Sequence, residues 1–469
     1  MNPLQLLDQW LDTSYQHLGD ERPILNWGNG RTWSLKNSFE GTLIVGNTGS
    51  GKTSGPGQII ARSFLRNDYS GLVLCVKDDE TKNWQNLCKL EGRERDLVVF
   101  RPEAGLCFNP LEFEPILENR VQLFLKLIDY GSPGAVAGAA VSFWTLECQR
   151  LLRNLFQLAD SAGLPPVMEA WENILKKAPS SLADLTTAAW LKDSPCAHAM
   201  KAASGKALLD RNTRLALDYF EVTFPTLNPK TRSIIVTMVG TTFDTLGRSP
   251  LFELFTGRST ISPRAIFDQG KILIVDLPVK VDKQVGRYAN VIWKYCFQQE
   301  VERRREKTPT FIWADEAQLF LTQEDYLFQT TARSSKCASV YLTQNYPNLL
   351  ATLGKHPTDS LVGNLLTRLF HRNDCPITND WASQLMGERM VEVVPPSGVM
   401  TPPSHRPAPY YEMVRIVPPH KFASLKCGGK KNGYIVEGYG MAPEQLPSSR
   451  IIRFHQIKPG RKGSCKPLP

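Results

Sequence analysis

Eight consecutive residues combine three glycines with a lysine and a threonine, a set of side chains suited to holding phosphate groups. They read Gly-Asn-Thr-Gly-Ser-Gly-Lys-Thr from Gly46 to Thr53, which fits the pattern G-x-x-x-x-G-K-[ST]. The glycines allow a tight curl that turns backbone N–H groups toward an anion. We expect Lys52 to reach the β- and γ-phosphates as a positive charge, and the Thr53 hydroxyl to bind Mg²⁺.

The segments on either side of this loop predict the strand and helix that would position it. Thr42 to Val45 is a short apolar run typical of a buried strand, and a helix-like pattern begins at Gln58. The positive end of that helix would face the anion. A glycine-rich turn without a ligand is the alternative, and the flanking strand and helix argue against it. The predicted nucleotide-binding residues are Gly46, Asn47, Thr48, Gly49, Ser50, Gly51, Lys52, Thr53 and Ser54.

A second chemical signal is a pair of adjacent acids at the end of another apolar run. Thr310 to Ala314 is rich in strand-forming residues and leads directly into Asp315 and Glu316. Open α/β sheets bind their ligands at such strand ends. We expect Asp315 to belong to the Mg²⁺ shell and Glu316 to polarise the attacking water. Capping of the following helix is the alternative role for these two carboxylates.

Two further side chains are candidates for contact with the γ-phosphate. A strand-like run from Ala338 to Leu342 is followed by Gln344, which we predict to be a sensor of hydrolysis. Arg333 precedes Gln344 by eleven positions. It is either a solvated helix residue or an arginine directed at the nucleotide of a neighbouring subunit, and the residues alone leave both open.

Composition limits the class of protein and its partners. The chain has 469 residues, which suggests two or three domains, and its hydrophobic fraction of 42% is ordinary for a globular protein. A formal net charge of +9 favours a polyanionic partner such as nucleic acid or an acidic membrane surface. Ten cysteines form no C-x-x-C pair, which argues against a structural zinc or a disulfide framework.

The two chemical motifs are far apart in the sequence, which indicates an insertion. Positions 52 and 315 are separated by 263 residues, more than the intervening strands and helices need. Helical apolar patterns fill residues 115–235, and strand signals return only at Lys271 to Leu277. The residues leave open whether these helices form a domain with its own role or only decorate the sheet. Later strand-like runs are Tyr410 to Ile416 and Tyr434 to Gly438, which we expect to close the sheet.

The motifs, taken in order, resemble those of the type IV coupling proteins of bacterial conjugation and secretion, the TraG/TraD family of RecA-like hexameric P-loop ATPases. The resemblance spans roughly residues 40 to 440. Besides the loop and the acidic strand, it rests on Phe108-Asn109-Pro110-Leu111, Ala332-Arg333, Thr343-Gln344-Asn345, Val362-Gly363-Asn364 and the stretch from Asp374 to Leu385-Met386-Gly387.

The resemblance implies an α/β fold, in which a RecA-like nucleotide-binding domain with a mainly parallel sheet carries an all-α insertion. It implies ATP and Mg²⁺ as ligands, Gln344 as the sensor and Arg333 as an arginine finger donated by the next subunit of a hexamer. It also implies DNA as cargo, with a bound relaxase as an optional part of it, and secretion-channel or membrane-anchor proteins as partners. The expected division is 1–40 for an N-terminal helix and hairpin, 41–114 with 236–445 for the nucleotide domain, 115–235 for the all-α insertion and 446–469 for a basic tail.

Two departures from the family pattern affect the functional expectation. An acidic-Pro-Lys-Gly-Glu turn is replaced by Lys77-Asp78-Asp79-Glu80, and no apolar run approaches the roughly 20 residues that a membrane span needs. We therefore expect a cytoplasmic protein without the family's membrane anchor, and peripheral association with the inner membrane stays open. Two alternatives also stay open: a soluble DNA pump unconnected with secretion, as in segregation or phage defence, and a nucleotide-gated receptor for protein substrates.

The N-terminal region predicts two local elements. Leu4, Leu7 and Leu11 have helical spacing within residues 1–15. Ile24 to Leu35 has the pattern of a β-hairpin with its turn at Asn29-Gly30.

Overall fold

The structure is a computed structural model that describes residues 16–28, 31–131, 143–208, 210–394, 409–443 and 449–456. The predicted N-terminal helix, the predicted turn at Asn29-Gly30 and most of the predicted basic tail lie outside the described residues. The chain forms two compact units. The first takes its described residues from 16–73, 82–97 and 301–456, and the second from 74–81 and 98–300.

A mainly parallel nine-stranded sheet contains the strands that carry the two motifs. Its order is β13-β12-β9-β3-β8-β7-β4-β6-β5. Strands β3, β7, β8 and β9 pair in parallel, whereas β12 pairs antiparallel with β9 and β13. The strands are β3 (Thr42–Val45), β4 (Ser70–Leu74), β5 (Leu97–Phe100), β6 (Ile272–Val275), β7 (Thr310–Ala314), β8 (Cys337–Thr343), β9 (Thr367–Phe370), β12 (Ile435–Met441) and β13 (Ile452–His455).

Side-chain burial explains why these short runs form central strands. Every residue of β3, β7 and β8 is buried, as expected for parallel strands covered on both faces. The predicted fold class, α/β with a mainly parallel sheet, is confirmed.

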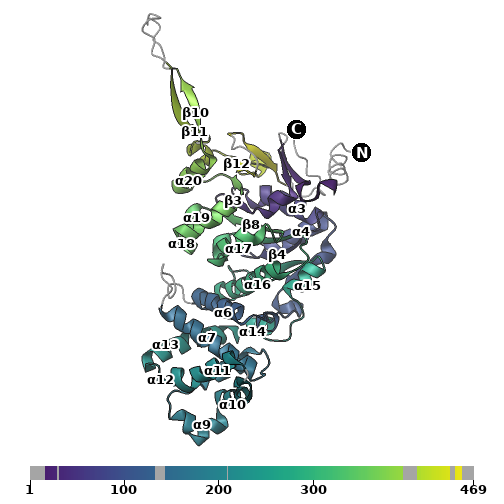
Figure 1. The fold of residues 1–469 in the computed structure, drawn as a ribbon. Coiled ribbons are helices and arrows are strands. Elements are labelled where there is room, and N and C mark those ends of the chain that lie inside the picture. The colour runs from purple at the N-terminus through teal and green to yellow at the C-terminus, as the bar shows by residue number, and fades with distance from the viewer. Residues whose placement is uncertain are drawn as a thin grey trace, which may run out of the picture. The chain divides into compact units, whose positions relative to one another are not determined.

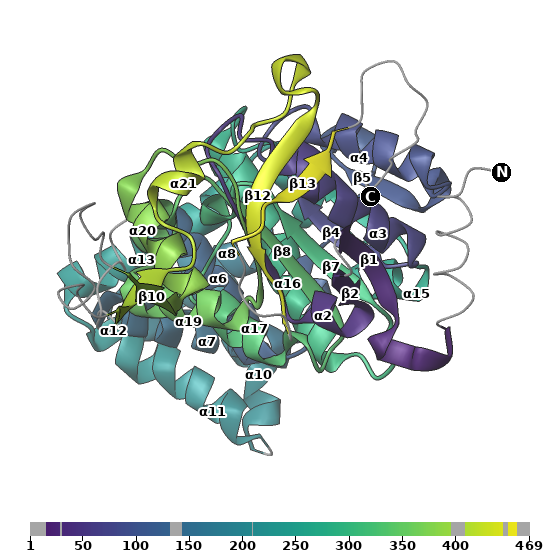
Figure 2. The ribbon, with the colours of Figure 1, turned by 90° about the horizontal axis from the view of Figure 1, so that it is seen from above.

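The helices of the first unit cover both faces of its strands. The chain leaves β3 through α3 toward β4, and leaves β8 through α18 and α19 toward β9, in the opposite direction along the sheet. Right-handed crossovers therefore place α3 on one face and α18 and α19 on the other. The connection from β7 to β8 through α17 runs in the same direction as that from β8 to β9, and Figure 2 shows α17 and α19 on the side opposite α3. These helices are α2 (Leu35–Phe39), α3 (Gln58–Arg66), α4 (Glu80–Leu90, mostly in this unit), α17 (Glu324–Ala332), α18 (Tyr346–Leu353), α19 (Lys355–Asn364), α20 (Pro376–Met386) and α21 (His420–Ala423).

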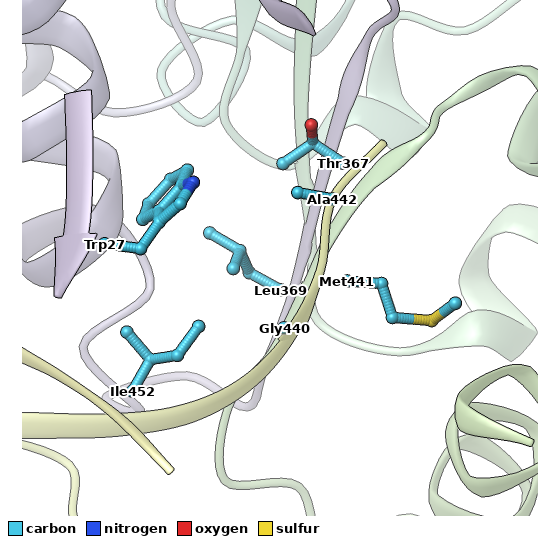
Figure 3. A pocket seen from close by; sticks show the side chains of 7 residues that line it. All are labelled: Trp27, Thr367, Leu369, Gly440, Met441, Ala442 and Ile452. Atoms are coloured by element: carbon cyan, nitrogen blue, oxygen red, sulfur yellow. The ribbon is translucent and has the colours of Figure 1, made fainter. Parts of the chain in front are cut away.

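A predicted hairpin packs on the sheet through its tryptophans. β1 (Pro23–Gly28) and β2 (Arg31–Ser34) pair antiparallel, and the Trp33 Nε1–H donates to Thr367 Oγ1 at 3.0 Å. Trp27 contacts the Trp33 ring and lines a small, mostly apolar pocket (Figure 3). The pocket is lined by Trp27, Thr367, Leu369, Gly440, Met441, Ala442 and Ile452.

A second hairpin corrects one expectation for the C-terminal part. The run Tyr410 to Ile416 was expected to close the central sheet, but β11 (Tyr410–Arg415) pairs with β10 (Glu388–Val393) in a separate two-stranded sheet. Its large side chains Met390, Tyr411 and Met413 are exposed, and Figure 1 shows the hairpin projecting beyond α20. The other expected run forms β12, which does belong to the central sheet.

The second unit is mostly helical and has its own aromatic core. Phe124 packs against Phe156 and Phe243, and Phe156 also contacts the Trp171 ring. Its helices are α5 (Pro110–Phe113), α6 (Leu117–Gly131), α7 (Phe143–Ser161), α8 (Met168–Lys176), α9 (Ala188–Asp193), α10 (Pro195–Ala207), α11 (Arg211–Asp218), α12 (Phe224–Thr226), α13 (Pro229–Leu246), α14 (Leu251–Phe255), α15 (Pro263–Asp268) and most of α16 (Lys283–Arg303).

The described part of 115–235 contains helices and no strand, but its predicted end at residue 235 falls inside α13. The predicted domain bounds stay a prediction. Among the described residues, no helix combines the length and apolar character that crossing a bilayer requires.

Candidate nucleotide-binding site

The glycine-rich loop follows β3 and curls back on itself. Gly46 N–H donates to Thr343 O at 3.1 Å, and Ser50 N–H donates to Asn47 O at 3.0 Å. Gly49 and Gly51 have φ values of 76° and 87°, a region that favours glycine. A Cβ at Gly51 would lie 2.4 Å from Val436 Cγ2, so this position also lacks space for a side chain.

The loop passes into its helix through a π-helical turn, Thr53–Gly57, which leads directly into α3. The N–H of Gly55 donates to Gly51 O at 2.7 Å. Gln456 Nε2 donates to Oγ of Ser54, the second residue of this turn, at 2.5 Å. Residues from the last described segment therefore hold the beginning of this helical turn.

The acidic pair lies against the Lys52 and Thr53 side chains. Asp315 and Glu316 follow β7 and are only 3% and 5% exposed. Thr53 Oγ1 donates to Asp315 Oδ2 at 2.9 Å, and Lys52 Nζ lies 3.3 Å from Glu316 Oε1. Two motifs more than 260 positions apart in sequence thus meet within hydrogen-bond distance.

Gln344 joins the same cluster from the end of β8. Its Nε2 donates to Glu316 Oε1 at 3.1 Å, so this oxygen accepts from both Lys52 and Gln344. The other carboxylate oxygen accepts from Gln318 Nε2 at 3.0 Å, and Gln318 Oε1 accepts from Thr343 Oγ1 at 2.9 Å. Sequence reasoning missed Gln318. Its position two residues after the acidic pair was the signal that could have suggested it.

The backbone at Glu316 adopts an uncommon conformation. Its φ and ψ are 59° and 53°, in the left-handed region that non-glycine residues rarely occupy. Such conformations cost about 1–3 kcal/mol and concentrate at functional sites. The surrounding hydrogen bonds and the burial of Glu316 hold the residue in this conformation.

The side chains present fit a nucleoside triphosphate with Mg²⁺. The Ser50 hydroxyl is buried in the loop and has no hydrogen-bond partner among the described residues, so it can serve a phosphate oxygen. Thr53 and Asp315 place two oxygen ligands together, which is the ligand type that Mg²⁺ prefers. Lys52 supplies the positive charge next to them.

A buried histidine supports the loop from behind. His371 is 1% exposed, and its backbone N–H donates to the backbone carbonyl of Val45 at 2.8 Å. A Cβ at Gly46 would lie 2.9 Å from His371 Cβ. Burial lowers the pKa of His371 to about 4, and the nearby charge of Lys52 acts in the same direction. The ring is therefore neutral at pH 7, and its Nδ1–H donates to Glu437 O at 2.9 Å.

This histidine predicts a pH-dependent stability. Because its pKa in the folded protein is below the unfolded value of about 6.5, the unfolded chain takes up the proton first as the pH falls from about 6.5 to 4. We expect the free energy of unfolding to fall by about 2 kcal/mol between pH 7 and pH 5 through this group. Urea denaturation of the wild type and of His371→Gln at both pH values measures the difference. His420 is exposed, and His420→Gln is the control. The same change in the free energy of unfolding between pH 7 and pH 5 in all three proteins would contradict the prediction.

Arg333 lies apart from this cluster. It follows α17, its side chain is 57% exposed, and its Nη1 lies 3.2 Å from Glu40 Oε1 of the same chain. Within the part of the chain that the structure describes, no hydrogen bond or ion pair joins it to Lys52 or Glu316. A role at a neighbouring subunit stays a prediction.

Comparison with solved structures identifies the fold. The bacterial conjugative coupling protein TrwBdeltaN70 superimposes with a TM-score of 0.64 at 15% identity, covering 94% of this chain and 89% of that one. The chain has the fold of a conjugative coupling protein. The same plasmid coupling protein solved in complex with ADP and Mg²⁺ gives a TM-score of 0.60 at 15% identity, over 92% of this chain and 88% of the other.

VirB4 of Thermoanaerobacter pseudethanolicus gives a TM-score of 0.50 at 13% identity, over 92% of each chain. No protein-family model matches the sequence, and no curated protein matches it significantly. The likeness therefore lies in the fold rather than in the overall sequence. The resemblance inferred from the motifs is confirmed at the level of that fold.

Proposed function

We propose that this chain is an ATP-hydrolysing motor of the type IV coupling protein class, which moves DNA toward a conjugation or secretion apparatus. One observation carries the proposal: Lys52, Thr53, Asp315, Glu316 and Gln344 come from three strand ends and form one hydrogen-bonded cluster. The fold supports it, because TrwB has been solved with an ATP analogue and with ADP and Mg²⁺.

Nucleotide binding uses the loop and the start of α3. The backbone N–H groups of Gly49 and Gly51 and the buried Ser50 hydroxyl surround the phosphates, and Lys52 provides their counter-charge. Thr53 and Asp315 would hold Mg²⁺, which when bound neutralises charge that develops on the phosphates. Lys52 also contacts Glu316. When phosphates bind, the positive charge of Lys52 therefore interacts with both the phosphates and the Glu316 carboxylate.

Hydrolysis uses Glu316 and Gln344. Glu316 is a carboxylate fixed by side-chain amides from Gln318 and Gln344, so it is oriented before a water is polarised. Gln344 lies at the end of a buried strand and connects Glu316 to the rest of the sheet. A change at the γ-phosphate is thereby transmitted to β8.

Assembly into a ring completes the proposed mechanism. In a homo-hexamer the exposed Arg333 would leave Glu40 and reach the nucleotide of the next subunit as an arginine finger. DNA, alone or with a bound relaxase, would pass through the ring. Cytoplasmic location, with secretion-channel or membrane-anchor proteins as partners, belongs to the same proposal.

DNA-stimulated ATPase activity tests this function. We expect single- or double-stranded DNA to raise the ATPase rate severalfold, because a motor couples turnover to its track. Micrographs of the same sample with an ATP analogue should show sixfold rings around DNA. A rate that DNA leaves unchanged would contradict the motor and favour a nucleotide-gated receptor for protein substrates.

A further inference from the structure

A five-residue segment joins the phosphate loop to Gln344. Strand β9 ends at Phe370 and helix α20 begins at Pro376, so residues 371–375 leave the sheet beside the loop. Strands β9 and β8 flank β3 on opposite sides, and all three are parallel. The segment thus starts on one side of the loop and makes contacts with the strand end on its other side.

Arg372 and Asp374 of this segment contact the loop. The N–H of Asn47 donates to Arg372 O at 2.9 Å, and Asn47 Nδ2 donates to Asp374 Oδ2 at 2.7 Å. Both contacts hold the second residue of the phosphate-binding pattern. A displacement of the loop at Asn47 is therefore transmitted to residues 372 and 374 through these two hydrogen bonds.

The segment also contacts Gln344, through Asn373. Asn373 is 2% exposed, and its Nδ2 donates to Gln344 O at 2.7 Å while its Oδ1 accepts from Cys375 N–H at 2.9 Å. Asn373 O accepts from Asn379 Nδ2 at 2.8 Å, which ties the residue to α20. Only an amide side chain of this length provides both the donor and the acceptor here.

We infer that Asn373 is a positioning residue for Gln344, and that segment 371–375 fixes the distance between the phosphate loop and that glutamine. The inference rests on the proposed function, in which Gln344 acts on hydrolysis. The hydrogen bond from Asn373 goes to the backbone carbonyl of Gln344 and not to its side chain. By fixing this carbonyl, it fixes the backbone position from which the Gln344 side chain extends. A misplacement of about 1 Å at a catalytic group can lower a rate about 100-fold.

The substitution Asn373→Asp removes the donor to Gln344 O and keeps the acceptor for Cys375. An aspartate keeps the acceptor for Cys375 N–H and adds a negative charge near the N-terminus of α20, where it is favourable. It cannot donate to Gln344 O. We expect kcat to fall about tenfold or more while the Kd for ATP stays near wild type. The melting temperature falls as well, because a buried carboxylate then faces the Gln344 carbonyl, so kcat and Kd are measured well below that temperature. Asn364→Asp is the matched control, since Asn364 Nδ2 also donates to a backbone carbonyl, that of Ser360, outside the site.

A double-mutant cycle with Gln344→Ala decides whether Asn373 acts through Gln344. If it does, the double variant is no slower than Gln344→Ala alone. An unchanged kcat in Asn373→Asp, or losses that multiply in the double variant, would overturn the inference. Asn373→Ala, examined the same way, serves if the aspartate variant does not fold. If Gln344→Ala itself keeps the full rate while ATP still binds, the proposed role of Gln344 fails, and the positioning role fails with it.

Discussion

The Glu316→Gln variant is expected to bind ATP normally and to hydrolyse it about 100- to 10,000-fold more slowly, the range typical of a lost general base. Glutamine keeps the length of the side chain and an acceptor oxygen for Lys52 or Gln344. It cannot accept a proton from water, so binding survives while the chemical step is lost. Single-turnover hydrolysis and equilibrium binding of a fluorescent ATP analogue measure the two effects separately.

An exposed glutamate provides the control for this substitution. Glu392 lies in the β10–β11 hairpin, away from the site, and Glu392→Gln should keep wild-type turnover. A Glu316→Gln variant with an undiminished rate would assign water activation to another group. Weaker binding together with slower turnover would instead indicate that the substitution disturbs the loop.

Lys52→Ala is expected to weaken ATP binding about 10- to 100-fold and to reduce turnover below detection. A charge-assisted hydrogen bond to a phosphate contributes about 1.5–3 kcal/mol, and every 1.4 kcal/mol is about tenfold in affinity. The same charge also stabilises the transition state, so the loss in turnover exceeds the loss in binding. Calorimetric titration with ATP and a phosphate-release assay are the measurements.

Lys355→Ala is the matched control for the lysine. Its side chain is 71% exposed and pairs with Asp359 on the same helix, so its removal should change neither affinity nor rate. Turnover that persists in Lys52→Ala would remove the glycine-rich loop from the mechanism. A lowered melting temperature without a change in affinity would make Lys52 only a partner for the buried Glu316.

The sequence predicted the strands that precede the two motifs better than the contacts around them. The strands that precede Gly46 and Asp315 were expected at Thr42 to Val45 and Thr310 to Ala314, and both have these bounds in the structure. Their signal is strong because each is a continuous apolar run that ends at a polar motif. The roles of the site residues stay predictions, although five of them form one cluster.

Contacts between distant segments could not be predicted. Strand β9 is as short as β3, but Arg368 interrupts it, so it lacks the continuous apolar run that marked β3. Its place beside β3 brings His371 and Asp374 to the loop, and Asn47 and Asp374 are 327 positions apart. Strand order is decided by packing among nine strands, which local propensity does not encode.

The contact of Val436 with the glycine-rich loop has a practical consequence for anyone shortening this protein. Val436 fills the space that a side chain at Gly51 would need, and Gln456 reaches Ser54. Deletion of the chain from about residue 430 onward would therefore uncover one flank of the candidate nucleotide-binding site, although none of the sequence motifs named above lies in the deleted part. Expression boundaries and C-terminal fusions are best chosen with this support kept intact.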